Sequence, residues 1–189
     1  VGSEMCIRDS GTPAGKLTVV GVTGTNGKTT TTYLIKQLLE RTKGAKVGLI
    51  GTNQNLISDK TIPTDRTTPD ALTVQRLLAQ MVDAGCTYAV MEVSSHALMQ
   101  SRVEGIRFRV GVFTNLTQDH LDYHGTMEEY YLAKRMLADM SRTMVINIDD
   151  EYGRRTADYC RMSGIQAVTT SVNTVSYTHL RAHETSQDL

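Results

Sequence analysis

A glycine-rich loop between a β-branched run and an amphipathic run constrains the fold of this 189-residue chain more than any other feature. Residues 17–23, LTVVGVT, predict a buried strand, and residues 30–41 repeat leucine and isoleucine at helical spacing. Between them lies GTNGKTT, residues 24–30. Glycines at such a junction let backbone N–H groups approach a phosphate, and the helix N-terminus favours its negative charge. The sequence therefore predicts a phosphate-binding loop at the carboxyl end of a strand.

Two side chains of this loop have the chemistry that nucleotide binding needs. A lysine in such a loop reaches the terminal phosphates, and the next hydroxyl binds Mg²⁺. Lys28 and Thr29 stand at these positions. The common loop pattern has a glycine where this chain has Val22, so an ordinary glycine-rich turn is the alternative interpretation.

Strand-like and helix-like runs alternate along the rest of the chain. Further strands are predicted at residues 46–50, 88–93, 108–114, 143–147 and 166–169. Helices are predicted from Pro69 to about Gly85, from a capping box at Thr126 and Glu129 to about Met140, and from about Glu151. Residues 51–68 are predicted to form a polar loop. This order predicts an α/β fold, a P-loop-containing and mostly parallel sheet with helices on both faces.

Polar residues follow the predicted strands, where ligands bind in such sheets. Glu92 ends an apolar run, and its carboxylate suits Mg²⁺, although a surface acid at a strand end is an equal alternative. The stretch TNLTQDHLDYHG, residues 114–125, gathers two aspartates and two histidines without zinc-ligand spacing. Its Asp122 and Gly125 match a GTPase switch element, but the chain has no Asn-Lys-x-Asp guanine reader, which disfavours a GTPase.

The composition excludes several function classes. Lysine plus arginine and aspartate plus glutamate number 20 each, which indicates no nucleic-acid partner. No apolar run approaches the roughly 20 residues of a membrane helix, so no membrane segment is expected. Cys86 and Cys160 form no disulfide or metal pattern and fit a cytoplasmic protein.

The two ends of the chain share an unusual relationship. Residues 1–9 and 175–183 can be written as the two complementary readings of one DNA segment, which resembles read-through of a sequencing adapter. We therefore expect residues 1–10 and 175–189 to be non-native tails. Residues 11–174 are expected to be a partial ATP-binding domain, an internal and truncated piece of a longer protein.

Three motifs together resemble the central ATPase domain of the Mur ligase family. They are GVTGTNGKTTTT at residues 21–32, MEVSSHAL at residues 91–98, and FTNLTQDHLDYHGTMEEYYLAKRML at residues 113–137. The family's own loop has this glycine spacing, which removes the difficulty with Val22. The resemblance implies that ATP phosphorylates a carboxylate and that an amine then attacks the acyl phosphate to form an amide.

The Ser-Ser-His and Leu-Asp-Tyr-His-Gly motifs are most similar to the family member that extends a muramoyl dipeptide. The resemblance thus implies a ligase of peptidoglycan precursor synthesis. Its substrates would be UDP-N-acetylmuramoyl-L-alanyl-D-glutamate and a diamino acid, either meso-diaminopimelate or L-lysine. Its cofactors would be ATP and Mg²⁺ at two sites, and the fragment alone is expected to be inactive because the flanking domains are absent.

The resemblance also assigns roles to single residues. Lys134, which on spacing alone is a solvated helix lysine, would become a carbamate that acts in catalysis together with Lys28, Glu92 and His120. Metal ligands would be Thr29, Glu92, His120 and the carbamylated Lys134. The ATP phosphates would contact Gly24, Thr25, Asn26, Gly27, Lys28, Thr29 and Thr30. The muramoyl substrate would contact Thr67, Thr68, Ser94, Gln100 and Arg102.

Two alternatives remain open at this point. Another Mur-type ligase or a folylpolyglutamate synthase would carry the same phosphate loop and form a different amide. A regulatory P-loop ATPase would release ADP and phosphate without forming an amide.

Overall fold

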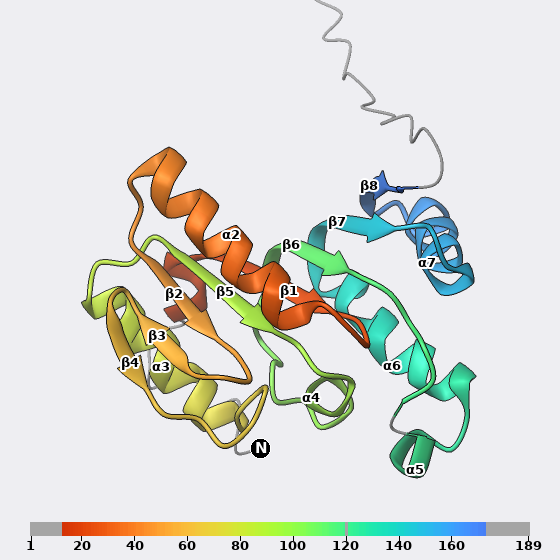
Figure 1. Cartoon of the computed structure of the whole chain (residues 1–189), viewed down its shortest axis with the longest axis horizontal. Coiled ribbons are helices and arrows are strands. Elements are labelled where there is room, and N and C mark those ends of the chain that lie inside the picture. The colour runs from red at the N-terminus through yellow and green to blue at the C-terminus, as the bar shows by residue number, and fades with distance from the viewer. Residues whose placement is uncertain (1–12, 120, 173–189) are drawn as a thin grey trace, which may run out of the picture.

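In the part of the chain that the structure describes, eight strands form one sheet in the order β4-β3-β2-β5-β1-β6-β7-β8 (Figure 1). The computed structural model describes residues 13–119 and 121–172. His120 and the tails predicted at residues 1–10 and 175–189 lie outside these ranges. The strands are β1 Thr18–Thr23, β2 Val47–Ile50, β3 Asn55–Ile57, β4 Lys60–Ile62, β5 Tyr88–Glu92, β6 Phe108–Phe113, β7 Ser141–Asn147 and β8 Gln166–Thr170.

Helices follow most of the strands. They are the 3₁₀ turn η1 Pro13–Lys16 and the helices α2 Lys28–Lys43, α3 Ala71–Asp83, α4 Ser95–Met99, α5 Leu121–His124, α6 Met127–Asp139 and α7 Glu151–Met162. In the part of the chain that the structure describes, no helix is long and apolar enough to cross a membrane.

Strand β1 lies between β5 and β6 and is parallel to both. From β1 the chain crosses to β2, returns to β5, and then continues on the other side of β1 at β6. The strand order therefore reverses next to β1, and ligands bind at such a switch point in open α/β sheets. The predicted fold class is confirmed: β2, β5, β1, β6, β7 and β8 pair in parallel, and among the described residues only β3 runs in the opposite direction, antiparallel to both β2 and β4.

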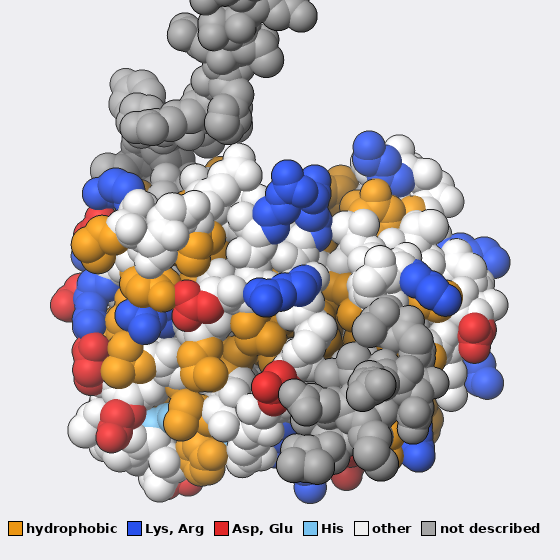
Figure 2. Space-filling model, turned by 180° about the vertical axis from the view of Figure 1, so that it is seen from behind, with side chains coloured by type: hydrophobic (Ala, Val, Ile, Leu, Met, Phe, Trp, Pro, Cys, Tyr) orange, Lys and Arg blue, Asp and Glu red, His pale blue; other side chains and the backbone are white. Residues whose placement is uncertain are grey.

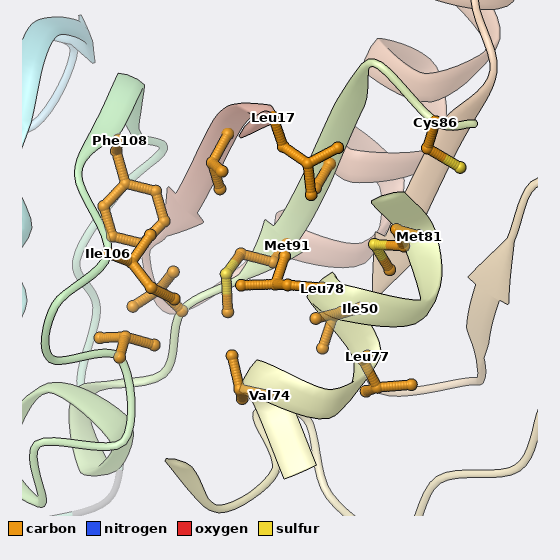
Figure 3. Packing of buried hydrophobic residues seen from close by; sticks show 14 of the residues in the cluster. Leu17, Ile50, Val74, Leu77, Leu78, Met81, Cys86, Met91, Ile106 and Phe108 are labelled. Atoms are coloured by element: carbon orange, nitrogen blue, oxygen red, sulfur yellow. The ribbon is translucent and has the colours of Figure 1, made fainter. Parts of the chain in front are cut away.

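Both faces of the sheet are covered by helices, as Figure 1 shows. On one face Ile35 and Leu39 of α2 pack on Val20, Val47 and Val90. The opposite face carries the largest apolar cluster, in which α3 packs against the central strands (Figure 3). Its members include Leu78 and Met81 of α3, Met91 of β5 and Phe108 of β6. Two buried faces explain why β1 and β5 are near-continuous apolar runs.

The helix boundaries follow from their caps. Thr126 and Glu129 form the predicted capping box of α6, because the Thr126 hydroxyl accepts from Glu129 N and the Glu129 carboxylate accepts from Thr126 N. For α3, the prediction that Pro69 lies in the first turn is wrong. Asp70 is the N-cap and accepts from Thr73 N at 3.0 Å, so the helix begins at Ala71. These hydrogen bonds lower the pKa of Asp70.

The predicted polar loop at residues 51–68 is wrong in its middle part. Residues 55–62 form the hairpin of β3 and β4, which extends the sheet beyond β2. Each strand has only three residues, too few for the alternation of polar and apolar side chains to stand out. Ser58 in the turn has a φ of 53°, a conformation that glycine or asparagine would have signalled better.

Candidate functional site at the carboxyl ends of the central strands

The glycine loop after β1 needs its glycines for two different reasons. Gly24 has a φ of 144°, and a Cβ on it would lie 1.9 Å from the Thr114 hydroxyl. Gly27 has a φ of 83° and is the N-cap of α2, without a side-chain hydrogen bond to the helix. The loop therefore packs directly on the end of β6. In the described part of the chain, no side chain caps the first N–H groups of α2.

The segment after β6 holds the loop in place by hydrogen bonds. Asn26 N donates to Asn115 Oδ1 at 3.0 Å, and Asn115 Nδ2 donates back to Asn26 O at 3.1 Å. Thr25 N donates to Asn115 O. The Thr25 hydroxyl donates to Thr117 O and accepts from Thr117 N. Hydrogen bonds between residues as far as 92 positions apart in sequence thus fix the conformation of the loop.

Two lysine amines meet on one carbonyl oxygen of this loop. Lys28 Nζ donates to Gly24 O at 2.9 Å and to Thr25 O at 2.7 Å. Lys134 Nζ, from α6, donates to the same Gly24 O at 2.8 Å. Because both amines bind one oxygen, two positive charges would lie side by side if both were protonated.

The environment of Lys134 resolves this conflict. Its side chain is 2% exposed, and burial lowers its pKa to about 7, with the charge of Lys28 acting in the same direction and Asp119 opposing. The Lys134 amine also lies 4.6 Å from the centre of the Tyr130 ring. A large share of Lys134 is therefore a neutral amine near neutral pH, the form that reacts with electrophiles. Burial lowers the pKa of Lys28 too, opposed by the carboxylates of Glu92 and Asp119.

Glu92 at the end of β5 is fully buried and lies near enough to Lys28 for its charge to act on that lysine. Its Oε1 accepts from Thr52 N at 2.9 Å, and its Oε2 lies 3.0 Å from the Thr52 hydroxyl. A Cβ on Gly51 would approach Oε1 to 2.5 Å, so only glycine leaves room for the carboxylate there. The buried acid is thus held by the segment after β2 and raises the pKa of Lys28 by its charge.

The predicted substrate residues form one connected network next to Glu92. The Thr68 hydroxyl donates to Glu92 O at 2.9 Å and accepts from Ser94 N at 3.1 Å. Arg102 donates to Thr68 O at 2.9 Å and to Gln100 Oε1 at 3.0 Å. Thr67 joins through its hydroxyl, which lies 3.0 Å from that of Thr52. The structure therefore brings all five predicted substrate residues together at the ends of β2 and β5.

Histidine and tyrosine rings pack against one another where α4, α5 and α6 meet. His124 is buried, and its Nε2 lies 2.8 Å from the Ser95 hydroxyl. Its ring centre lies 4.8 Å from that of Tyr130, and the ring of Tyr123 lies 4.0 Å from that of His96. His124 and His96 are thus tied into packing, and the structure does not describe His120, the histidine predicted to bind metal.

The oxygen donors near the glycine loop suit Mg²⁺ better than a metal that needs several protein side chains. Among residues 13–119 and 121–172, no three or more His, Cys, Asp or Glu side chains are arranged to hold a metal ion. Mg²⁺ commonly takes only one or two protein carboxylates and completes its shell with phosphate oxygens and water. The buried carboxylate of Glu92 and the Thr29 hydroxyl in the first turn of α2 are donors of this kind. The residues present therefore fit Mg²⁺ in company with a nucleotide.

A hollow of about 440 Å³ opens beside the loop, on the side of β6, β7 and β8. Asn26, Gly27 and Thr31 form its edge at the loop, and Val112 and Val145 form an apolar part of its lining. Its volume lies within the range of small-molecule sites. A nucleotide whose phosphates lie on the loop has room here for its sugar and base.

Sequence reasoning missed several residues that build this site. Thr52 holds Glu92, Tyr130 contacts both Thr25 and Lys134, and Asn115 holds the loop. Asn115 lies in the polar stretch after a predicted strand that the sequence had singled out, but without a role of its own, and Thr52 could have been found by the same rule. Tyr130 has no such signal, since its position inside α6 is that of an ordinary core residue.

Comparisons with known proteins find similar sequences for most of the chain. The model of the Mur ligase middle domain matches residues 22–189. A Clostridium tetani protein named UDP-N-acetylmuramoyl-L-alanyl-D-glutamate--2,6-diaminopimelate ligase is 57% identical over 145 residues, which are 77% of this chain and 30% of that protein. The protein of the same name from Gloeobacter violaceus is 57% identical over 148 residues, again 77% and 30%. The chain thus spans about 30% of the length of these relatives.

Solved structures give the same picture at the level of the fold. A structure of UDP-N-acetylmuramoyl-L-alanyl-D-glutamate--2,6-diaminopimelate ligase superposes with a TM-score of 0.74 at 35% identity, over 84% of this chain and 33% of that one. Folylpolyglutamate synthase of Mycobacterium tuberculosis, complexed with ADP and AMPPCP, has a TM-score of 0.70 at 16% identity, over 88% and 46%. The second likeness is one of fold alone.

Proposed function

Because this chain belongs to the Mur ligase family, we propose that it is the ATP-binding part of a ligase of peptidoglycan precursor synthesis. The reaction joins 2,6-diaminopimelate to UDP-N-acetylmuramoyl-L-alanyl-D-glutamate, as the names of its relatives state for those proteins. Residues 11–174 are proposed to be part of the central ATP-binding domain, and the remaining ends to be non-native. The parent protein is proposed to act in the cytoplasm.

One observation carries this proposal. Lys28 and Lys134 converge on Gly24 O at the point where the strand order of the sheet reverses, and the buried carboxylate of Glu92 acts on Lys28 by its charge. A reaction between a carboxylate and a polyphosphate brings two anions together. Cations and oriented N–H groups must offset that repulsion in the transition state.

The residues of this chain have separate tasks in the proposed reaction. The loop N–H groups and Lys28 hold the ATP phosphates, with Thr25, Asn26 and Thr30 shaping the loop. The substrate carboxylate attacks the terminal phosphorus and ADP leaves. The amine of the diamino acid then attacks the acyl carbon, phosphate leaves, and the amine loses a proton. Thr29 would hold a first Mg²⁺, and Glu92 with His120 a second. When bound, these ions would supply positive charge to the phosphoryl oxygens.

Lys134 is proposed to act as a carbamate. Its neutral amine adds to carbon dioxide and loses a proton, which turns a buried amine into an anion near the metal sites. The buried position and the pKa of about 7 support the first step, because only the unprotonated amine reacts. Thr67, Thr68, Ser94, Gln100 and Arg102 are proposed to bind the muramoyl dipeptide, with Arg102 as the cation for its acidic group.

The first experiment uses the complete parent protein. With ATP, the muramoyl dipeptide and diaminopimelate, we expect amide product in amounts equal to the ADP released, and less product with L-lysine. A folate in place of the dipeptide should give no product. Release of ADP without any amide would instead support the regulatory ATPase, and activity on folate would support folylpolyglutamate synthase.

Substitutions in the same protein test the residue roles. Lys134→Ala should abolish ligation, and ¹³C-bicarbonate should give a carbamate NMR signal in the wild type that this variant lacks. Full activity of the wild type in carbon-dioxide-free buffer would remove the carbamate from the proposal. Glu92→Gln should raise the Mg²⁺ concentration needed for half-maximal rate about tenfold or more, and an unchanged Mg²⁺ titration would exclude its metal role.

A further inference from the structure

A second hollow, of about 380 Å³, opens at the amino ends of β1, β6 and β7. These are the ends of the strands opposite to the glycine loop. Three arginines line the hollow: Arg107, Arg109 and Arg142. Figure 2, which shows the molecule from behind the view of Figure 1, has Lys and Arg side chains gathered on the upper middle of that face, with hydrophobic side chains between them.

The register of the sheet places two of these arginines side by side. Phe108 pairs with Ser141 and Val110 with Thr143, so Arg109 and Arg142 are neighbours on adjacent parallel strands. Arg142 lies two residues before Met144, which is buried on the α6 side of the sheet, so the two residues share that face, and Arg109 lies at the matching position on β6. Like charges at facing positions on neighbouring strands destabilise a sheet. Within the described ranges no carboxylate forms an ion pair with any of the three arginines.

A buried amide lies in the same lining. Gln75 of α3 is 4% exposed, and its Oε1 has no hydrogen-bond partner among the described residues. A buried polar atom of this kind normally has a donor, and a bound molecule with a hydroxyl or N–H group could supply it. The hollow therefore combines surplus positive charge with an unused acceptor, two features that different parts of one ligand could satisfy.

The remaining lining is apolar. Leu17 and Phe108 border the hollow and are almost completely buried. Inorganic phosphate is far smaller than this space, whereas small organic ligands occupy hollows of this volume. Guanidinium groups bind anions through pairs of parallel hydrogen bonds, and a phosphate group offers three acceptor oxygens and nearly two negative charges to the three arginines.

We propose that this hollow binds a small molecule that carries a phosphate group, with the phosphate on Arg107, Arg109 and Arg142. A hydroxyl or N–H group of the ligand reaches Gln75, and its body packs on Leu17 and Phe108. The site is separate from the glycine loop by the length of β1 and does not depend on the proposed ligase activity. A molecule bound here adds a point of control or attachment outside the catalytic centre.

The test is an NMR titration of the ¹⁵N-labelled 189-residue chain at constant ionic strength. The probes are inorganic phosphate, ribose 5-phosphate and AMP. We expect saturable shifts of the Gln75 side-chain amide and the Gly105 backbone signal, tightest for the probe whose body fits the hollow. Arg109→Gln with Arg142→Gln should weaken this binding about tenfold or more per arginine. Arg41→Gln, an exposed change on α2, should leave it unchanged.

Binding at the glycine loop is distinguished by where the shifts occur. Phosphate held there moves the signals of Gly24 and Gly27 equally in the wild type and in the arginine double variant. The proposal is overturned if the shifts are confined to that loop. It is also overturned if the shifts at Gln75 do not saturate, or if the wild type and the double variant bind every probe with the same affinity.

Discussion

The two ends of the central strands both gather cationic side chains, but in opposite surroundings. At the carboxyl end, Lys28 and Lys134 are drawn onto a carbonyl of the glycine loop, and Lys134 is almost completely buried. At the amino end, Arg107, Arg109 and Arg142 line an open hollow and remain exposed. Strand β1, six residues long, separates the two groups by about 20 Å.

The difference shows how burial decides what a cation can do. An arginine at the surface stays charged and binds anions through charge. A lysine under a loop loses its proton readily, and its amine becomes a reactive or readily modified group. The same strands thus present a chemical centre at one end and an electrostatic surface at the other. Four substitutions probe this contrast through the free energy of unfolding.

Gly24→Ala should have the largest effect. The substitution combines a φ of 144° with a Cβ placed 1.9 Å from the Thr114 hydroxyl, so we expect a loss of about 3 kcal/mol or more. Urea denaturation of the 189-residue chain measures it. Gly44→Ala is the matched control, since Gly44 also has a positive φ but no atom within 4 Å of its Cβ position. That control should lose only about 1 kcal/mol, and equal losses in the two variants would contradict the crowding at the carboxyl end.

Lys134→Met should change how stability depends on pH. The pKa of Lys134 is about 7 in the folded chain, against 10.5 when exposed. Between these values the unfolded chain holds a proton that the native chain lacks, so this residue makes stability rise with pH, by up to about 1.4 kcal/mol per pH unit. Denaturation from pH 6 to pH 10 should show that slope in the wild type and a smaller one in Lys134→Met. The exposed Lys43→Met should keep the wild-type slope.

Tyr130→Phe should cost about 1 kcal/mol, because it removes a buried hydroxyl 3.4 Å from that of Thr25 and leaves the ring against Lys134. Thermal and urea unfolding measure the change, with Tyr33→Phe on α2 as the control. A variant as stable as the wild type would mean that the hydroxyl does not help to hold the glycine loop.

Arg142→Gln should have the smallest effect and the opposite sign. Removing one of two neighbouring like charges should stabilise the chain by less than about 0.5 kcal/mol in phosphate-free buffer. High salt should remove the gain because it screens exposed charges. A clear loss of stability would indicate that Arg142 has a structural partner, and the contrast between the two strand ends would then weaken.

Most of the fold could be predicted because the relevant signals are local. The β-branched runs, the helical spacing and the capping box at Thr126 each involve a few neighbouring residues, and the corresponding elements lie within a few residues of the predicted ranges. The hairpin at residues 55–62 escaped because three-residue strands carry almost no periodic signal.

The candidate site divides in the same way. Lys28 and Glu92 could be chosen from their places after strands, whereas Lys134 was chosen only by resemblance to a family. Nothing in the spacing of α6 distinguishes Lys134 from a solvated lysine, since its contact with Gly24 O joins residues 110 positions apart. Thr52 could have been chosen by the rule that selected Glu92, but its bond to that carboxylate could not.

By itself, the sequence determined a parallel α/β sheet with a phosphate loop after its first strand, because glycine conformations and side-chain periodicity act over short stretches of chain. The tertiary structure alone decided that one lysine of α6 lies buried beneath that loop and that two arginines stand side by side at the other end of the sheet. Burial and strand register arise only when distant segments pack together. The pKa of a lysine and the repulsion between arginines depend on those neighbours.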